Sequence, residues 1–576
     1  MTTLPVFPIH LYNQTHLDTN SLDRSFEGSP DDMTNDYNPF RINGIQTYNP
    51  LYAQFLSLNG LTNESVQLNH KYHIVDSQTV KDISTGINHT KPVFIKYSPL
   101  LDPIRFMIGK YAPDGSAIYN LPQLNSVGYP KLDDKNNAAY TDCFFYYLTS
   151  KVLHDYHFVH GTDFYGSFLG VQDKYKMNVA DDIEYLNTSP YFNENLNKLF
   201  TICNHDSSSY YADSSRTNRI KLRISGGNTH NISAICLDDI IDVEVPSDGV
   251  EETETVYENH SKTETSKESS DNSSSSSDNS DYNDSSDEDD EDKNWETDSN
   301  EDEEDGEDEE DEEDESSEAE DSTIGDDVQY GYLNKFPVQL ICLEKCKGTM
   351  DELFIKHKLD DETAAAALFQ VIMMLLTYQK MFHFTHNDLH TNNIMYNDTS
   401  EPYLYYRYEN IVYKVPTYGK IFKLIDFGRS IYTFNGTTVC SDSFAAGGDA
   451  ATQYNCEPYY NKTKPVIEPN YSFDLCRLGC SIYDFIIPDD EDYSKYDDLQ
   501  KTIHRWCLDD RGKNVLYKRN GDERYPNFKL YKMAARTVHN HTPQAQLKEP
   551  YFKQFAYTGK LKNAICMDID TLPCCV

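Results

Sequence analysis

The residues with the clearest chemical potential lie in FTHNDLHTNNIMY, from Phe384 to Tyr396. This stretch places two histidines, one aspartate and three asparagines directly after an apolar run. Asp388 can accept a proton from an attacking hydroxyl, and Asn393 can turn its amide oxygen toward a metal ion. The spacing therefore predicts acid–base chemistry beside a metal site.

A second carboxylate that could complete this metal site occurs in FKLIDFGRS. Asp426 follows an apolar strand pattern that includes Phe422 and Leu424, and Gly428 allows a sharp turn that would aim Asp426 into a cleft. Metal-held phosphates and a positioned base are the parts that phosphoryl transfer requires. The two stretches together predict a metal-dependent phosphoryl-transfer site.

These motifs resemble those of the protein kinase-like superfamily. HNDLHTNN is similar to its catalytic loop, and IDFG to its metal-binding Asp-Phe-Gly. The resemblance implies that Lys96, in VFIK, orients the phosphates of ATP, that Asp388 is the catalytic base, and that Asn393 and Asp426 hold Mg²⁺. Longer strings such as FIKYSPLLDP, GDAATQYN and YPNFKLYKMAARTVHNHTP resemble the serine/threonine kinases of giant DNA viruses.

The resemblance extends to segments around the site. LICLEKC is similar to the last N-lobe strand and the hinge, which implies that Leu343 is the gatekeeper residue. Glu344 to Cys346 would then bind adenine through their backbone. SFDLCRLGCSIYDF resembles a C-lobe helix whose aspartate, here Asp474, holds the catalytic loop from below.

Three positions depart from the family pattern. No Gly-x-Gly-x-x-Gly motif precedes Lys96, and only Gly86 lies in the expected turn. The helix after Lys96 shows no obvious glutamate, so Asp142 is the candidate partner of Lys96. Asn387 replaces an arginine that normally receives an activation-loop phosphate, and a neutral amide cannot form that charged pair. We therefore expect activity that does not require activation-loop phosphorylation.

Local patterns predict the elements that carry these motifs. Apolar residues at helical spacing predict helices at AAYTDCFFYYLTSKVLHDYHFV and at 362–382, where Asp360 or Asp361 can cap the start. KYHIVDSQTV and KPVFIKYS suggest a hairpin, FPVQLICLEKC a buried strand, and EPYLYYRYENIVYKVPTYGK a second hairpin.

The expected fold class is α+β, a bilobal protein kinase-like fold with a β-rich N-lobe, a long partly disordered insertion and a helical C-lobe. The predicted boundaries are an extension at 1–65, an N-lobe at 66–346 that includes an insertion at 171–335, a C-lobe at 347–545 and a tail at 546–576.

Charge is concentrated in the insertion. The net charge is −45, and residues 251–327 carry about 37 acidic and 3 basic side chains. A segment so acidic and poor in apolar residues cannot bury a core, which predicts disorder over about 246–328. This segment is either a solvated linker or a contact for basic proteins. No basic patch suggests nucleic-acid binding.

The sequence shows no signal peptide, and its longest apolar run, from Val371 to Leu376, is too short to span a membrane. The 13 cysteines are scattered, which indicates reduced thiols. We expect an intracellular, reducing location, the host cytoplasm or the virion, with no membrane partner.

The expected function is ATP- and Mg²⁺-dependent phosphorylation of Ser or Thr in protein substrates. Two alternatives stay open: a small-molecule phosphotransferase of the aminoglycoside or choline kinase type, suggested by the Asp-Leu-His at 388–390, and a pseudokinase scaffold. The His and Asp residues of 383–390 could also be read as a zinc cluster, although their spacing matches no common metal-hydrolase motif.

Overall fold

The computed structural model describes residues 28–205, 328–488, 493–519, 521–561 and 565–576, with a few positions before residue 28. These residues form a mixed α+β structure, as the sequence predicts. The acidic segment at 246–327 lies outside the described residues, so its predicted disorder stays a prediction.

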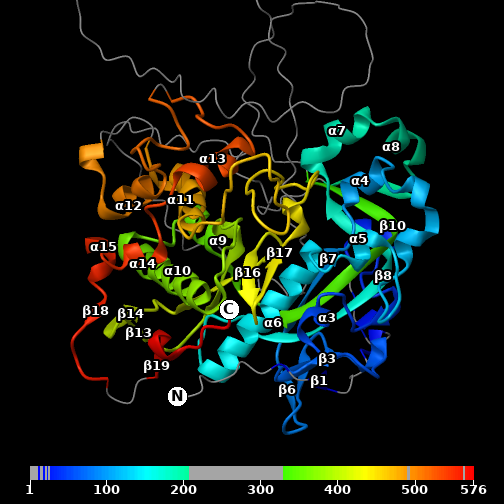
Figure 1. Cartoon of the computed structure of the whole chain (residues 1–576), viewed down its shortest axis with the longest axis horizontal. Helices are drawn as coiled ribbons and strands as arrows, with labels where there is room; N and C mark the ends of the chain where they lie inside the picture. The colour runs from blue at the N-terminus through cyan, green and yellow to red at the C-terminus, as the bar shows by residue number, and fades with distance from the viewer. Residues whose placement is uncertain are drawn as a thin grey trace, which may run out of the picture. The chain divides into compact units, whose positions relative to one another are not determined.

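The strand that carries Lys96 belongs to a five-stranded antiparallel sheet (Figure 1). Its hydrogen-bonded order is β2-β8-β10-β7, and β9 also pairs with β10. The strands are β2 (Ile42–Gln46), β7 (Val93–Pro99), β8 (Phe164–Asn178), β9 (Phe200–His205) and β10 (Val328–Glu344). Lys96 lies opposite Ile341 of β10. Among the described residues, no strand pairs with the other edge of β7.

The predicted hairpin between KYHIVDSQTV and KPVFIKYS is wrong. The first run folds on itself as β4 (Tyr72–Asp76) and β5 (Thr79–Asp82), which join β6 (Asn88–Thr90) in a separate sheet. The second run, β7, pairs with β10 instead, more than 230 residues later in the chain. Both runs are β-prone, but local alternation cannot specify which strands pair.

The sheet also includes residues that the sequence analysis placed outside the N-lobe core. β2 lies within the predicted extension and pairs with β8. The ends of β8 and β10, and all of β9, fall in the predicted insertion, so part of that segment belongs to the sheet.

Two long helices flank the site. α6 (Ala138–Tyr156) begins at Asn137, whose side chain accepts a hydrogen bond from the Ala139 N–H. α10 (Asp361–Phe382) begins at Asp360, whose carboxylate accepts from the Thr363 N–H at 2.9 Å. Both helices and the Asp360 cap were predicted. Among the described residues, α10 is the one helix long and apolar enough to cross a membrane, and it is almost entirely buried within the protein.

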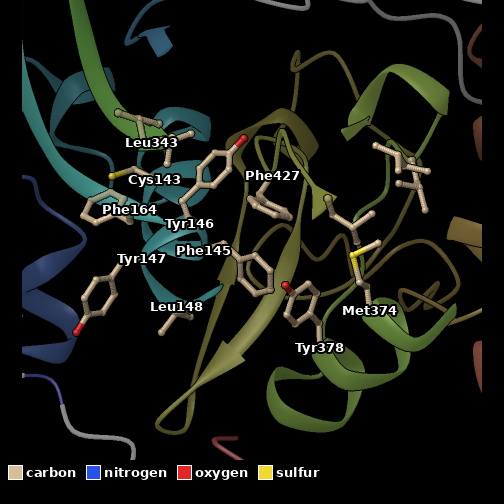
Figure 2. Close-up of a cluster of buried hydrophobic side chains, with 14 of the residues drawn as sticks. Cys143, Phe145, Tyr146, Tyr147, Leu148, Phe164, Leu343, Met374, Tyr378 and Phe427 are labelled. Carbon is tan, nitrogen blue, oxygen red and sulfur yellow. The ribbon is translucent and has the colours of Figure 1, made fainter. Parts of the chain in front are cut away.

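Aromatic side chains join α6 to the segments around it (Figure 2). The ring of Phe145 lies 4.7 Å from that of Phe427 and 5.5 Å from that of Tyr378 on α10. On the next position of α6, the ring of Tyr146 lies 4.8 Å from Phe427. Figure 2 shows Leu343 of β10 on the far side of Tyr146 from Phe427. This packing fixes α6 against the loop that begins at Asp426.

Two further sheets include strands that contact α10, namely β14 and β15. A three-stranded sheet has the order β11-β12-β15, and the predicted hairpin at 401–420 forms as β13 and β14, to which β18 and β19 of the C-terminal tail add. These strands are β11 (Gly348–Thr349), β12 (Ile394–Asp398), β13 (Tyr403–Tyr408), β14 (Ile411–Pro416), β15 (Lys420–Leu424), β18 (Ala556–Tyr557) and β19 (Cys566–Asp568).

The other short strands and helices complete the described chain (Figure 1). They are β1 (Leu11–Tyr12), β3 (Gln67–Leu68), β16 (Ile431–Phe434), β17 (Thr437–Cys440), α2 (Pro30–Thr34), α3 (Tyr52–Phe55), α4 (Pro103–Met107), α5 (Pro130–Asp133), α7 (Ile183–Thr188), α8 (Pro190–Asn195), α9 (Met350–Ile355), α11 (Phe473–Ile486), α12 (Asp498–Trp506), α13 (Lys529–Thr537), α14 (Pro543–Gln546) and α15 (Pro550–Lys553).

A buried histidine should make stability depend on pH. The ring nitrogens of His160 lie 2.7 Å from the Phe422 carbonyl oxygen and 2.7 Å from the Tyr406 hydroxyl. Burial lowers the pKa of His160 to about 3. The unfolded chain binds a proton below about pH 6.5 and the folded chain does not, so this group should lower the unfolding free energy by about 1.4 kcal/mol per pH unit as the pH falls.

Urea unfolding at pH 7, 6 and 5 would measure this slope. A His160→Gln variant should show a shallower slope than the unmodified protein. Equal slopes for His160→Gln and the unmodified protein would contradict the prediction.

Candidate functional site

One cavity, of about 370 Å³, gathers three of the six predicted site residues, and Asn393, Glu344 and Cys346 do not line it. Lys96, Asp142, Asp388 and Asp426 all line it, although Lys96 and Asp426 lie 330 residues apart in the chain. Arg429 lines it as well. The rest of the wall comes from Gly428 and from segments within 98–111, 131–139 and 442–449.

Lys96 forms two ion pairs inside this cavity. Its Nζ lies 2.9 Å from Asp142 Oδ2 and 2.9 Å from Asp426 Oδ1. The predicted pairing of Lys96 with Asp142 is therefore confirmed. Asp142 lies on the second turn of α6, and its side chain reaches Lys96 although aspartate is shorter than glutamate.

The pKa values of these three groups reflect burial and mutual attraction. Burial alone would lower the pKa of Lys96, but the two carboxylates raise it well above its usual value. Burial, together with the nearby charge of Asp426, raises the pKa of Asp142 although Lys96 acts to lower it. For Asp426, burial also acts upward, but Lys96 brings the pKa below the usual value. Lys96 and Asp426 are therefore charged at neutral pH.

The backbone at Asp426 adopts a left-handed conformation. Its φ is +61°, which is uncommon for a residue with a side chain. The expectation that Gly428 supplies the sharp turn is wrong, because Gly428 does not have a positive φ. Two side chains of α6 hold the turn: the Asp426 N–H donates to the Tyr146 hydroxyl at 2.8 Å, and the Phe427 N–H donates to Asp142 Oδ1 at 2.7 Å.

Asp474 holds the loop that carries Asp388, as predicted. From the first turn of α11, its carboxylate accepts the His386 N–H at 2.9 Å and the Asn387 N–H at 2.8 Å. All three residues are buried. His386 supports the loop, because its Nε2 lies 2.9 Å from the Ile425 carbonyl oxygen.

Replacing Asp474 by asparagine should lower stability. Asparagine has one acceptor oxygen, so one of the two buried N–H groups would lose its partner at a cost of about 1–3 kcal/mol. Urea unfolding would measure the change. Asp484→Asn, on the same helix at a half-buried position that accepts from the Tyr517 hydroxyl, is the control and should cost less than 1 kcal/mol, roughly. An equal cost for both variants would contradict the role of Asp474.

Asn387 connects three segments through its side chain. Its amide nitrogen donates to the Arg429 carbonyl oxygen at 2.9 Å, and its amide oxygen accepts from the Tyr454 hydroxyl at 2.8 Å. Its φ of +65° is a conformation that asparagine tolerates. The side chain is thus engaged with neutral partners inside the protein.

Asn393 carries an acceptor suited to a metal ion. Its amide nitrogen donates to the Asp388 carbonyl oxygen at 2.9 Å, which fixes the orientation of the amide. Its Oδ1 is buried and has no hydrogen-bond partner in the described part of the chain. A buried acceptor without a hydrogen-bond partner destabilises the folded state. The Asn393 amide oxygen and the Asp426 carboxylate are oxygen ligands of the kind that Mg²⁺ prefers. Asn393 and Asp426 therefore fit a Mg²⁺ ion.

The zinc alternative is not supported. Among the described residues, no group of three or more His, Cys, Asp or Glu side chains could hold a metal ion. Within 383–390, the Nε2 atoms of His386 and His390 are directed to the Ile425 carbonyl and the Asn393 amide.

The predicted adenine-binding residues do not line the cavity. Neither Glu344 nor Cys346 is part of its wall. The Glu344 N–H donates to the Asp163 carbonyl oxygen at 2.9 Å, and its carboxylate contacts Lys423 and Asn397. Gly86, which was expected in a loop over the phosphates, lies instead in the turn between β5 and β6.

Three contacts around the site were not predicted. The Tyr531 hydroxyl of α13 donates to Asp388 Oδ1 at 3.0 Å, and Arg429 Nη1 lies 3.6 Å from Asp388 Oδ2. Tyr146 accepts the Asp426 N–H. A signal existed for Arg429, because it follows IDFG directly. Tyr531 lies 143 residues from Asp388, and no local pattern distinguishes it.

Comparison with known proteins adds no relative. No protein-family model matches the chain, and no curated protein has a significantly similar sequence.

Proposed function

We propose that this protein transfers the γ-phosphate of ATP to serine or threonine hydroxyls of protein substrates, using a bilobal protein kinase-like fold. In this proposal β7, β8, β10 and α6 belong to the N-lobe, and α10, α11 and α13 to the C-lobe. The observation that carries the proposal is the single cavity that Lys96, Asp388 and Asp426 share.

The geometry supports a role for each of these residues. Lys96, kept charged by two carboxylates, would bind phosphate oxygens. Mg²⁺ held by Asn393 and Asp426 would neutralise the charge that develops on the transferred phosphoryl group. Asp388, at the cavity wall, would orient the acceptor hydroxyl and accept its proton.

One observation favours a scaffold without transfer activity. Glu344 and Cys346 lie outside the cavity, and among the described residues no strand pairs with the outer edge of β7. Adenine recognition would then depend on other residues. Against this alternative, a scaffold has no chemical need for Lys96, Asp388, Asn393 and Asp426 together.

The decisive experiment measures ATP γ-phosphate transfer by the purified full chain with Mg²⁺. The acceptors should include basic, neutral and acidic proteins as well as aminoglycosides and choline, and Asp388→Asn serves as the inactive control. Transfer to protein Ser or Thr that the control lacks supports the proposal. Transfer to a small molecule alone would favour the phosphotransferase alternative, and no transfer would favour the scaffold.

Phosphatase treatment should leave the activity within about twofold of the untreated value. Asn387 carries no charge, and its side chain contacts the Arg429 carbonyl and the Tyr454 hydroxyl rather than a phosphate-binding cluster. The measurement compares initial rates before and after treatment, with mass spectrometry to verify dephosphorylation. A loss of activity that reversed on rephosphorylation would contradict this prediction.

A further inference from the structure

The carboxylate of Asp388 has two oxygens in different surroundings. Oδ1 accepts a hydrogen bond from the Tyr531 hydroxyl at 3.0 Å. Oδ2 lies 3.6 Å from Nη1 of Arg429. Asp388 and Arg429 line the cavity, and Tyr531 does not. Oδ1 is therefore bound by a residue outside the cavity wall, and Oδ2 faces a residue of that wall.

The direction of the Tyr531 hydrogen bond is fixed by a buried arginine. Arg477 of α11 donates from Nη2 to the Tyr531 hydroxyl oxygen, and its guanidinium lies 4.4 Å from the centre of the Tyr531 ring. Because a guanidinium only donates and a hydroxyl has a single proton, that proton is left for Asp388. α11 and α13, which carry Arg477 and Tyr531, pack side by side (Figure 1).

Packing leaves the Tyr531 ring little freedom. Tyr531 is 4% exposed, its ring stacks on Phe528 at 5.3 Å, and Phe473 lies 6.1 Å away. On the backbone side, the Asp388 carbonyl oxygen is held by Asn393 at 2.9 Å. Both the main chain and one carboxylate oxygen of Asp388 are thus fixed by neighbours.

We propose that Tyr531, supported by Arg477, is a positioning residue that holds Asp388 by Oδ1 and thereby presents Oδ2 to the acceptor hydroxyl. The inference rests on the proposed function and adds which oxygen of Asp388 faces the substrate and which side chains keep it there. Holding a reacting group in one orientation contributes to the rate of the chemical step rather than to substrate binding.

Tyr531→Phe tests this directly, because it removes one oxygen atom and keeps the packed ring. We expect kcat to fall about tenfold while the KM values for ATP and acceptor stay within about twofold, the pattern for a group that acts in the transition state. Tyr517→Phe is the matched control. It removes a hydroxyl that donates to Asp484 Oδ1 at 2.7 Å, outside the cavity wall, and should leave kcat unchanged.

A second measurement does not depend on activity. The urea unfolding midpoints of the unmodified protein, Tyr531→Phe, Asp388→Ala and the double variant form a double-mutant cycle. The change in midpoint caused by Tyr531→Phe should be markedly smaller when residue 388 is alanine. Unchanged kcat in Tyr531→Phe, or a change in KM alone, would overturn the proposal. So would additive midpoint shifts. If the unmodified protein transferred no phosphate, the proposed function would fail, and the cycle would still decide whether Tyr531 holds Asp388.

Discussion

Replacing Asp388 by asparagine should lower the rate of phosphoryl transfer by about 10²–10⁴. Asparagine has the same shape and still accepts a hydrogen bond from the Tyr531 hydroxyl, but its amide cannot take up the proton of an attacking hydroxyl. Nucleotide binding should stay within about threefold, because Lys96 and Asp426 are unchanged. Steady-state kinetics and nucleotide titration of the same preparation would separate the two effects.

The matched control is Asp398→Asn. Asp398 is exposed at the end of β12, ten residues after Asp388, and does not line the cavity. This variant makes the same chemical change in the same part of the chain and should keep at least half of the activity. If Asp388→Asn retained more than about a tenth of the activity, Asp388 would not be the base, and another group of the cavity wall would have to accept the proton.

The placements on which sequence and structure agree depend on short-range spacing. Asp388 and Asn393 lie in one loop, and Asp426 follows directly after a strand, so residue type and order were enough. Asp142 could be named because helical periodicity placed it on α6 after the strand of Lys96. The ion pair between Lys96 and Asp142 agrees with that prediction, whereas the ion pair between Lys96 and Asp426 was not predicted.

The parts that could not be predicted depend on contacts between distant segments. β7 pairs with β10 rather than with the nearer β-prone run. The alternation of apolar and polar residues along β7 would be the same with either partner, so it could not predict the pairing. Tyr531 reaches Asp388 because α13 packs on α11, which no pattern near either residue encodes. The Gly428 prediction failed for a different reason. Glycine permits a positive φ, but the residue with the positive φ is Asp426, where hydrogen bonds to Tyr146 and Asp142 hold the backbone.

The hinge prediction shows how a motif can be right about an element and leave its role open. LICLEKC does form the end of a buried strand, in which Leu343 is buried. Yet the side chain of Glu344 is engaged with Lys423 and Asn397. A sequence pattern can identify the strand. It cannot predict which of the strand's residues line a cavity, because that depends on how side chains from distant segments pack.

Lys96→Met should destabilise the fold as well as remove phosphate binding. Methionine fills a similar volume but leaves Asp142, 2% exposed, and the partly buried Asp426 without a cation. Breaking a buried ion pair from one side costs about 3–5 kcal/mol. Lys91→Met is the control: Lys91 is 35% exposed, and its partner Asp163 keeps a contact with His154 at 2.7 Å. This control should cost about 1 kcal/mol or less.

The stability of Lys96→Met should be partly restored by a second substitution and should depend on pH. Adding Asp142→Asn to Lys96→Met removes the buried charge while keeping an acceptor for the Phe427 N–H, so the double variant should be more stable than Lys96→Met alone. Because burial raises the pKa of Asp142, its folded state favours the protonated form. Stability is then lost as the pH rises. The loss in unfolding free energy caused by Lys96→Met should therefore be smaller at pH 5 than at pH 7. Urea unfolding of the four proteins at both pH values would measure these effects. A deficit that was the same at both pH values, or a double variant no more stable than Lys96→Met, would show that the Lys96 ion pairs do not hold this site together.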